Sequence, residues 1–274
     1  MKMSDFVINV NDTSTVRSAT SSKGNQKKWR ISEKWIKADD LGYEGLSETI
    51  CSRLADALKF PYGVVKYSPC IIYDENRMQN MTGCFSDSFI NNLNEITLGR
   101  LMKNYFDTDI AEYLDRNIST EEKAEYVVTR LSHLNGLADA GRYLSDLFLF
   151  DRIVLNEDRH YHNIIFLYDR ERFYYAPLFD CGAALLSDVS YDYPMVTPLS
   201  ICLRNVKSKP FSKSFTRQSE VFSQKYGNSF SIRSAAVKIS DLYNYYSSEM
   251  IKRAADVIVS QYRRIDSGLN ISFE

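Results

Sequence analysis

The chain has no long apolar run and no sign of an export signal. In its 274 residues, no hydrophobic stretch approaches the roughly 20 residues that span a bilayer. The first dozen residues also lack the apolar segment of a secretory signal. These absences predict a cytoplasmic protein that does not insert into a membrane.

Cysteine is scarce and scattered. The five cysteines are odd in number, and no two are spaced as CxxC, the arrangement typical of zinc sites. Widely separated cysteines predict reduced thiols, as is usual in the cytosol. Neither a disulfide framework nor a zinc site is therefore expected.

Net charge is nearly absent, because 34 lysines and arginines face 35 aspartates and glutamates. Such a balance argues against a protein whose partner is nucleic acid or an anionic membrane, although it leaves room for a local basic site. A hydrophobic share of 44% beside 25% charged residues is sufficient for a packed core. The chain shows no internal repeat and no Pro/Gly linker that would separate independent domains.

The pattern of residues changes along the chain, and residues 1–93 are predicted to be mostly strands with one helix inserted. A hairpin is expected within residues 16–37, where the stretch SSKGN supplies turn chemistry. Leucine and isoleucine recur every four positions from Leu46 to Leu58, which predicts a helix with one apolar face. Further strands are predicted at residues 34–38, 64–73 and 82–89.

Residues 94–274 are predicted to be mostly helical. Ser119 and Glu122 have the spacing of a capping box, which opens a helix that reaches about Leu134. A strongly apolar helix is predicted at 139–153, a hairpin at 164–176 and a final helix at 249–263. Two lobes of one functional unit, 1–93 and 94–274, fit this layout.

The most informative polar residues lie between the apolar helix and the hairpin. Asp158 and Asn163 have the spacing of the kinase catalytic loop D-x-x-x-x-N, and the hairpin returns the chain to Asp180. Oxygen ligands such as Asn163 and Asp180 can hold Mg²⁺ on nucleotide phosphates, while Asp158 takes the proton of the accepting hydroxyl. The alternative is a solvated loop whose Asp and Asn only cap turns. His160 is expected to be structural and to tie the loop backbone together.

A kinase site also needs a lysine on the phosphates and a helix glutamate that holds the lysine. Lys37 ends a predicted strand, and Glu48 lies early on the predicted helix that follows. A lysine on a strand and a glutamate on a helix are each common, so the site is indicated only by their order, a strand lysine followed by a helix glutamate. Glu44, one helical turn earlier, is the alternative partner of Lys37.

Upstream, residues 21–28 (SSKGNQKK) form a candidate phosphate loop. Its single glycine, Gly24, lets the backbone approach phosphate, and successive amides can form an anion-binding concavity. The segment matches neither the Walker A pattern nor the GxGxxG of ordinary protein kinases. A basic surface hairpin would have the same composition.

Together these features resemble the HipA-like serine/threonine kinases, and within them the smaller cell-translocating kinase A type. The resemblance covers roughly residues 15–265. Its blocks are the loop Ser21-x-x-Gly24-x-Gln26-x-Lys28, the pair Lys37 and Glu48, the loop Asp158-x-His160-x-x-Asn163, and Phe179-Asp180. Lys209-Pro-Phe-Ser212 also looks like a short block of the smaller members.

The resemblance implies an α+β, bilobal protein-kinase-like fold, with ATP and Mg²⁺ as cofactors. It makes Asp158 the catalytic residue and Asn163 and Asp180 the metal ligands. The residues that it assigns to nucleotide binding are Ser21, Ser22, Gly24, Gln26, Lys28, Lys37, Glu48, His160 and, at the adenine-contacting hinge, Asp87 and Phe89. In HipA-like enzymes the loop serine is itself phosphorylated. Here that serine corresponds to Ser21, with Ser22 beside it as the alternative.

Partners follow from the same resemblance. The expected substrate is a protein serine or threonine, and a cognate antitoxin or regulator is a candidate partner, as in toxin–antitoxin systems. Full-length HipA toxins carry an additional N-terminal subdomain. By comparison with those toxins, this chain starts late. Some relatives act on proteins of a foreign host, so delivery into a host cell is an alternative to the cytoplasm.

The sequence therefore predicts an ATP-dependent serine/threonine protein kinase that autophosphorylates at Ser21 or Ser22. One alternative is a phosphoinositide-type lipid kinase, which shares the loop Asp-Arg-His-x-x-Asn but uses a basic, membrane-facing surface. The other is a non-catalytic kinase-fold module that binds or regulates a partner. Its hallmark would be the loss of a key site residue, and all four are present: Lys37, Asp158, Asn163 and Asp180.

Overall fold

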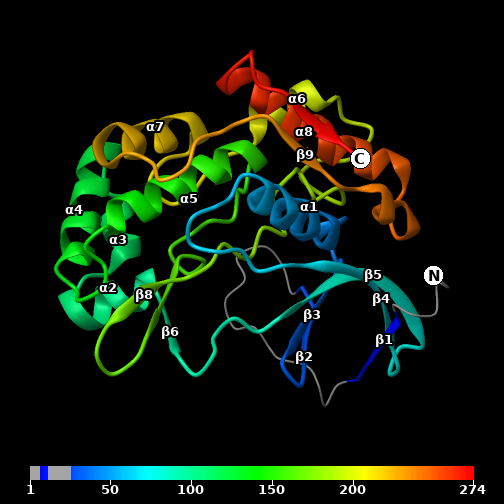
Figure 1. The fold of residues 1–274 in the computed structure, drawn as a ribbon, viewed down its shortest axis with the longest axis horizontal. Helices are drawn as coiled ribbons and strands as arrows, with labels where there is room; N and C mark the ends of the chain where they lie inside the picture. Colours follow the sequence, from blue (N-terminus) through cyan, green and yellow to red (C-terminus); the bar gives the residue numbers. More distant parts are fainter. Residues whose placement is uncertain (1–6, 12–25) are drawn as a thin grey trace.

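A computed structural model describes residues 7–11 and 26–274 of the chain, and it has a strand-rich part and a helix-rich part (Figure 1). The strand-rich part is a five-stranded sheet formed by β1 (Val7–Val10), β2 (Lys28–Ile31), β3 (Lys34–Ala38), β4 (Ser68–Asp74) and β5 (Gln79–Asp87). The strand order is β1-β4-β5-β3-β2. All neighbouring pairs are antiparallel except β1 and β4, which run parallel.

The predicted strands of this sheet are present. Strand β3 has the predicted bounds, and β4 and β5 overlap the predicted segments 64–73 and 82–89. Strands β2 and β3 form an antiparallel hairpin in which Lys28 pairs with Lys37, and this hairpin turns at Ser32 and Glu33. The turn expected at SSKGN, residues 21–25, lies outside the described residues, and the hairpin that the structure describes is a different one, within residues 28–38.

The helix-rich part contains most of the remaining chain. Its helices are α2 (Leu98–Phe106), α3 (Ile110–Asp115), α4 (Thr120–Ser132), α5 (Ala140–Val154), α6 (Leu199–Asn205), α7 (Phe215–Tyr226), α8 (Ser248–Ile265) and the short 3₁₀ helix η3 (Ser240–Asn244). The capping box that opens α4 is confirmed, because Ser119 Oγ accepts from the Glu122 N–H while Glu122 accepts from the Ser119 N–H. Helices α5 and α8 confirm the predicted helices at 139–153 and 249–263.

Short strands interrupt this helical part and correct two predictions. Residues Asn94–Thr97 form β6, not a helix, and β6 pairs with β7 (Ile165–Tyr168), which forms the predicted hairpin with β8 (Phe173–Tyr175). The chain ends in β10 (Ile271–Phe273), which pairs with β9 (Ala235–Val237), and not in a helix. Strands of three or four residues are too short to show a periodic pattern, so only their tertiary pairing reveals them. The division of the chain after residue 93 stays a prediction.

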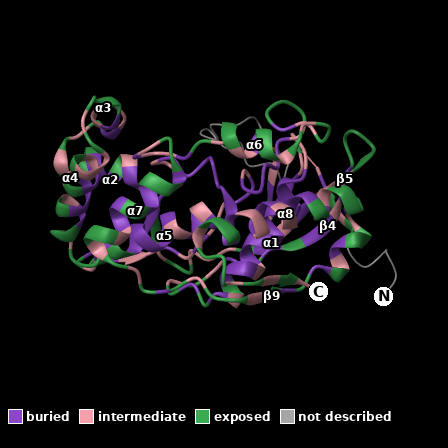
Figure 2. Ribbon diagram, turned by 90° about the horizontal axis from the view of Figure 1, so that it is seen from above, coloured by how far each residue is buried: buried purple, intermediate pink, exposed green. Residues whose placement is uncertain are grey.

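Helix α1 (Glu44–Ala57) lies between the sheet and the helical part (Figure 1). Its predicted apolar face is fully buried at Leu46, Ile50 and Leu54, in the same hydrophobic core as helices α5 and α8. Complete burial of a leucine contributes about 1.5–3 kcal/mol. Figure 2 shows α1 and α5 as largely buried helices. Although α1 belongs to the N-terminal part of the sequence, the C-terminal helices therefore fix its position.

On its other side, α1 approaches the sheet at a contact between two glycines. A Cβ atom on Gly45 would lie 2.6 Å from the Gly83 carbonyl carbon, and one on Gly83 would lie 2.2 Å from the Lys37 carbonyl oxygen. No side chain fits at either distance. The contact holds the first turns of α1 against β3 and β5, and this brings Glu48 to Lys37.

The Gly83→Ala variant should be destabilised, because the added methyl group would clash with the β3 backbone at Lys37 and Ala38 and with the Ile72 side chain. We expect the free energy of unfolding to fall by about 1–3 kcal/mol, the usual cost of overpacking, as measured by urea denaturation. Gly268→Ala is the matched control, since a Cβ there meets only the Asp266 side chain, at 3.3 Å. Equal stability of the two variants would show that strand β3 and Ile72 can move away from Gly83 at no cost.

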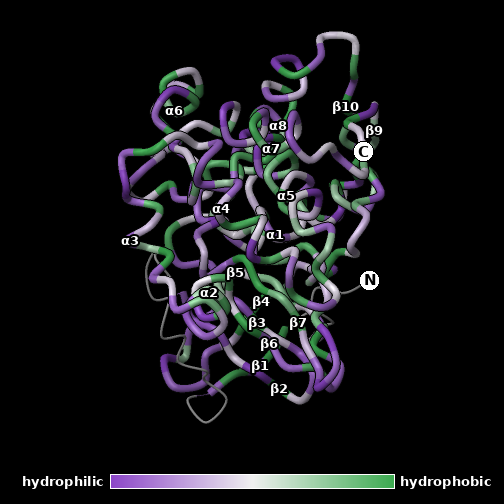
Figure 3. Tube along the Cα trace, turned by 90° about the vertical axis from the view of Figure 1, so that its left-hand side faces the viewer, coloured by the Kyte–Doolittle hydropathy of each residue, from purple (hydrophilic) through white to green (hydrophobic). Residues whose placement is uncertain are grey.

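The two parts lie at opposite ends of the molecule in Figure 3, with β1–β3 at one end and α6–α8 at the other. In residues 7–11 and 26–274, no helix has the length and apolar character needed to cross a membrane. All five cysteines are buried and unpaired.

Candidate active site

The loop between α5 and β7 is buried, which argues against the solvated-loop alternative. Arg159 is only 1% exposed, and its guanidinium pairs with Asp151 of α5 at 3.1 Å. The same side chain donates to the carbonyl oxygens of Asn163, at 3.2 Å, and of Phe179, at 3.0 Å. Arg159 therefore holds the Asp158 loop and the Asp180 segment together.

Arg159 positions the two segments of the candidate site, and the sequence pattern did not assign it this part. The sequence signal was an arginine directly after Asp158, with Asp151 one turn before the end of the preceding helix. Because buried charges need a partner, an arginine between apolar segments indicates a nearby carboxylate. The pattern does not say which carboxylate, and only the structure identifies Asp151.

Asp158 lies at the centre of a set of polar contacts. Asn163 Nδ2 donates to the Asp158 carbonyl oxygen at 2.8 Å and lies 3.4 Å from its carboxylate. His160 Nε2 is 3.7 Å from one carboxylate oxygen, and Lys209 Nζ is 3.3 Å from the other. The local turn, in which Asn163 N–H donates to the His160 carbonyl, brings Asp158 and Asn163 to one side of the loop.

His160 has the structural place expected of it. Its ring nitrogen Nδ1 accepts from the His162 N–H at 3.0 Å, within the loop itself. Burial lowers the pKa of His160 and outweighs the opposite effect of the Asp158 charge. A neutral imidazole that hydrogen-bonds its own loop suits a brace better than a proton carrier.

Asp180 follows the β7–β8 hairpin and meets two lysines. Its Oδ1 lies 2.7 Å from Lys37 Nζ and 4.0 Å from Lys28 Nζ. Burial alone would raise the pKa of the Asp180 carboxyl, but the charges of Lys37 and Lys28 outweigh burial and hold the pKa well below its usual range. The Asp180 backbone is left-handed, with φ of 56°, a conformation that Asp and Asn adopt more readily than most residues.

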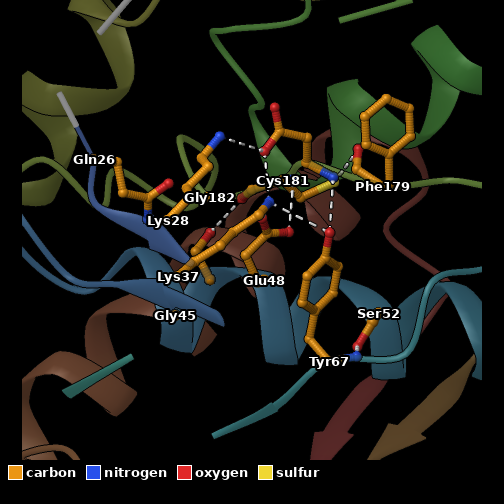
Figure 4. A network of polar contacts seen from close by, with 12 residues as sticks. Gln26, Lys28, Lys37, Gly45, Glu48, Ser52, Tyr67, Phe179, Cys181 and Gly182 are labelled. Atoms are coloured by element: carbon orange, nitrogen blue, oxygen red, sulfur yellow. Dashed lines mark hydrogen bonds and ion pairs between the residues drawn. The ribbon is translucent and has the colours of Figure 1, made fainter. Parts of the chain in front are cut away.

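Lys37 is the link between the strand, the helix and the Asp180 segment (Figure 4). Its Nζ contacts Glu48 Oε1 at 2.5 Å in addition to Asp180, and Tyr67 OH lies 3.4 Å away. Burial would lower the pKa of Lys37, but Asp180 and Glu48 together raise it well above the ordinary value. The second oxygen of Glu48 accepts from the Cys181 N–H at 2.8 Å. Lys37 is therefore charged. Together Lys37 and Glu48 hold the segment after β8 at two points, the Asp180 carboxylate and the Cys181 N–H.

Glu44, the alternative partner, does not contact Lys37. Its carboxylate instead accepts the backbone N–H groups of the residues just before α1, Asp40, Leu41 and Gly42, at 3.2, 2.7 and 3.2 Å. Burial, together with the charge of Asp39, raises the pKa of Glu44 to about 7. Glu44 thus ties the loop before α1 to the first turn of the helix, while Glu48 faces the lysine one turn later.

The Glu44 pKa predicts a pH effect on stability. A carboxyl whose folded-state pKa is raised binds more protons in the folded than in the unfolded state, so its contribution is full below about pH 4.5 and is lost as the pH rises through 7. The loss amounts to about 3 kcal/mol. We expect the Glu44→Gln variant to lose less stability than the unsubstituted protein between pH 5 and pH 8, as measured by urea denaturation. Parallel curves for the two proteins would contradict this.

Two adjoining cavities lie along these residues. The larger, of about 330 Å³, has Val65, Tyr67, Phe89, Ile165 and Phe179 as its apolar lining and Lys37 and Asp180 at its inner end. The smaller is lined by Gln26, Lys28, Glu44, Glu157, Asp158, Asn163, Asp180 and Asp188, with others. Lys28 and Asp180 line both cavities, so the two adjoin and together make up the candidate cleft.

The predicted site residues that the structure describes gather at this cleft. Asp158, Asn163 and Asp180 line its smaller cavity together with Gln26 and Lys28. The expected hinge residues, Asp87 and Phe89, line the larger cavity beside Lys37. Glu48 lies behind Lys37, and Gln26 Nε2 donates to the Ala38 carbonyl at 2.9 Å. Ser21, Ser22 and Gly24 lie outside the described residues.

The donor set fits a magnesium ion shared with phosphate. Asn163 uses its Nδ2 on Asp158, and its Oδ1 accepts no hydrogen bond from any residue that the structure describes. Among those residues no three His, Cys, Asp or Glu side chains form a metal site by themselves. An amide and a carboxylate oxygen are hard ligands that bind Mg²⁺ when phosphate oxygens and water complete the coordination. Asn163 and Asp180 would hold such an ion.

Comparison with known proteins supports the fold. No protein-family model and no curated protein sequence matches the chain. Among solved structures, the chain is similar to the proinflammatory kinase CtkA of Helicobacter pylori, with a TM-score of 0.57 and 13% identity over 94% of this chain and 95% of CtkA. A weaker match is HipA of Shewanella oneidensis, in a complex with HipB and operator DNA, with a TM-score of 0.47 and 13% identity over 91% of this chain and 66% of HipA. The chain therefore has the α+β kinase fold of CtkA, as the resemblance to HipA-like kinases implied.

Proposed function

We propose that the chain is an ATP-dependent serine/threonine protein kinase that transfers the γ-phosphoryl group of Mg-ATP to a protein hydroxyl. The carrying observation is that Lys37 contacts both Glu48 and Asp180 in a cleft that Asp158 and Asn163 also line. Phosphoryl transfer needs a lysine on the phosphates, metal-binding oxygens and a carboxylate for the acceptor. The kinase fold shared with CtkA supports the same assignment.

The larger cavity suits the adenosine part of ATP. Its walls are apolar at Val65, Phe89 and Phe179, and the last two rings pack 5.3 Å apart between centroids. A flat apolar slot with backbone at one edge can bind a purine by burial and a few hydrogen bonds. In this arrangement residues 86–90 supply that edge, where β5 ends.

The inner end of the cleft suits the phosphates. Lys37 and Lys28 place two positive charges beside Asp180, and the candidate phosphate loop leads directly into Lys28. Magnesium held by Asn163 and Asp180 would neutralise charge that develops on the transferring group. Lys37, fixed by Glu48, orients the phosphates so that the γ-phosphoryl group faces Asp158.

Asp158 acts on the accepting hydroxyl in this proposal. A carboxylate in the smaller cavity can accept the hydrogen bond of a serine or threonine and take its proton as the new O–P bond forms. Ser21 or Ser22, in the phosphate loop, is the proposed site of autophosphorylation. The nearly neutral charge of the chain favours a protein over an anionic lipid surface as the substrate.

Incubation with labelled Mg-ATP tests the proposal. Separate reactions contain the protein alone, the protein with a generic basic protein, and the protein with vesicles that carry phosphoinositides. We expect label on protein, with mass spectrometry locating phosphate on serine or threonine, including Ser21 or Ser22. Label on the lipid alone would support the lipid-kinase alternative, and absence of ATP binding at millimolar Mg²⁺ would revive a non-catalytic module.

A further inference from the structure

A lysine distant in the sequence reaches the proposed catalytic aspartate. Lys209 lies between α6 and α7, and its Nζ is 3.3 Å from Asp158 Oδ1. The lysine side chain is 42% exposed, whereas the Asp158 side chain is 11% exposed. Lys209 thus reaches from the molecular surface to Asp158, which lines the smaller cavity of the cleft.

The loop that carries Lys209 is built to hold it in place. Gln218 of α7 is 1% exposed, and its amide donates to the Lys209 carbonyl at 2.8 Å. The Gln218 carbonyl oxygen accepts from the N–H groups of Phe211 and Ser212, at 2.9 and 3.1 Å. Ser208 closes the loop, because its hydroxyl donates to the Ser212 carbonyl at 2.7 Å. A buried amide that satisfies three backbone groups makes this a rigid loop.

The other cations near the cleft already have partners. Lys37 is paired with Glu48 and Asp180, and Arg159 is paired with Asp151. Lys28 lies 4.0 Å from Asp180. Among the lysines and arginines that the structure describes, Lys209 is the one that contacts the Asp158 carboxylate.

We propose that Lys209 is a further catalytic residue, which contacts the γ-phosphoryl group of bound ATP. This inference rests on the proposed kinase function. In the transfer, the bond between the γ-phosphorus and the β,γ-bridging oxygen breaks, and a bond from the substrate oxygen to that phosphorus forms. Asp158 receives the hydroxyl proton, and ADP leaves with the bridging oxygen. Lys209 donates hydrogen bonds throughout and exchanges no proton.

The physical reason is the charge of the transferring group. Negative charge spreads over its three equatorial oxygens, and cations placed at that point stabilise the transition state. Lys37 and a magnesium ion act from the nucleotide side of the cleft. Lys209 would act from the acceptor side, and its pairing with Asp158 would keep both groups aligned before ATP binds.

Three variants test the assignment: Lys209→Met, Lys209→Arg and, as control, Lys213→Met. Lys213 is an exposed lysine of the same loop, so its replacement makes the same change in charge. Turnover with Mg-ATP and the affinities for ATP and ADP, by calorimetry, are measured on the full chain. Thermal unfolding of each variant is recorded in parallel.

We expect Lys209→Met to lower turnover by about 10²- to 10³-fold, the usual cost of one lost transition-state donor. ATP binding should weaken by at least roughly tenfold with ADP binding unchanged, because only ATP carries the γ-phosphate. Lys209→Arg should recover part of both losses, and Lys213→Met should behave as the unsubstituted protein.

Two outcomes would overturn the assignment while leaving the kinase proposal intact. In the first, the unsubstituted protein transfers phosphate and the Lys209→Met variant transfers it at the same rate. In the second, the Lys209→Met variant loses ATP and ADP affinity equally and melts at a lower temperature, as expected when a structural ion pair is removed. An unsubstituted protein that neither binds ATP nor transfers phosphate would overturn the proposed function, and this inference with it.

Discussion

The Asp158→Asn variant is expected to transfer phosphate about 10²- to 10⁴-fold more slowly than the unsubstituted protein, with nearly unchanged affinity for ATP. An amide cannot take the proton of the accepting hydroxyl. It can still accept a hydrogen bond from Lys209 or Asn163, so the loop geometry should persist. Nucleotide affinity should persist as well, because Lys37 and the apolar slot around Phe89 are untouched. Turnover with labelled ATP and calorimetric ATP binding measure the two effects separately.

Asp115→Asn is the matched control for this experiment. Asp115 is exposed at the end of α3, so its replacement removes the same charge without touching the cleft. Its turnover should equal that of the unsubstituted protein. Phosphate transfer at an undiminished rate by Asp158→Asn would remove Asp158 from the proton-accepting role and, with it, the proposed mechanism.

Loss of the Asp180 carboxylate should abolish the effect of magnesium on ATP binding. In the unsubstituted protein, Mg²⁺ is expected to strengthen ATP binding. In Asp180→Asn and Asp180→Ala this gain should shrink by at least roughly 10- to 100-fold, the range seen when an outer-sphere partner of a metal is removed. Without Mg²⁺ the substitutions should not weaken ATP binding. In the variants Asp180 no longer competes with the phosphates for Lys37 and Lys28, so ATP should bind the variants at least as well as the unsubstituted protein.

The two substitutions at position 180 differ in what else they change. Asparagine tolerates the left-handed backbone there, whereas alanine adds a conformational penalty at a φ of 56°. A magnesium effect lost in both variants, with a lower melting temperature in Asp180→Ala alone, would separate the ligand role from the backbone role. Calorimetry with and without Mg²⁺ decides the matter. An unchanged magnesium effect in Asp180→Asn would remove Asp180 from the proposed metal site.

Several parts of the molecule were predictable because they depend on neighbours in the sequence. The capping box at Ser119, the apolar face of α1 and the turn at Asp169 between β7 and β8 all rest on residues a few positions apart. The catalytic-loop pattern is equally local, since Asn163 bonds to Asp158 five positions away. Such contacts recur wherever the same short sequence occurs, so the pattern by itself indicates them.

The short strands β6, β9 and β10 were not predictable in this way. Each consists of three or four residues, and each exists because a partner strand lies beside it. The choice between Glu44 and Glu48 was also open from the sequence. One helical turn separates them, and the packing of Gly45 against Gly83 decides which of the two faces Lys37.

By itself, the sequence determined which chemistry the chain can carry: the aspartates, the asparagine and the lysine of a phosphoryl-transfer site, in a workable order. Only the tertiary structure decided how these groups meet. Lys37 and Asp180 are 143 positions apart in the chain, and Lys209 lies 51 positions from Asp158. The buried pair of Arg159 and Asp151 ties the two loops together. The physical reason is that charges can be buried only against partners, and partners so distant are selected by the packing of helices and strands, which no local pattern records.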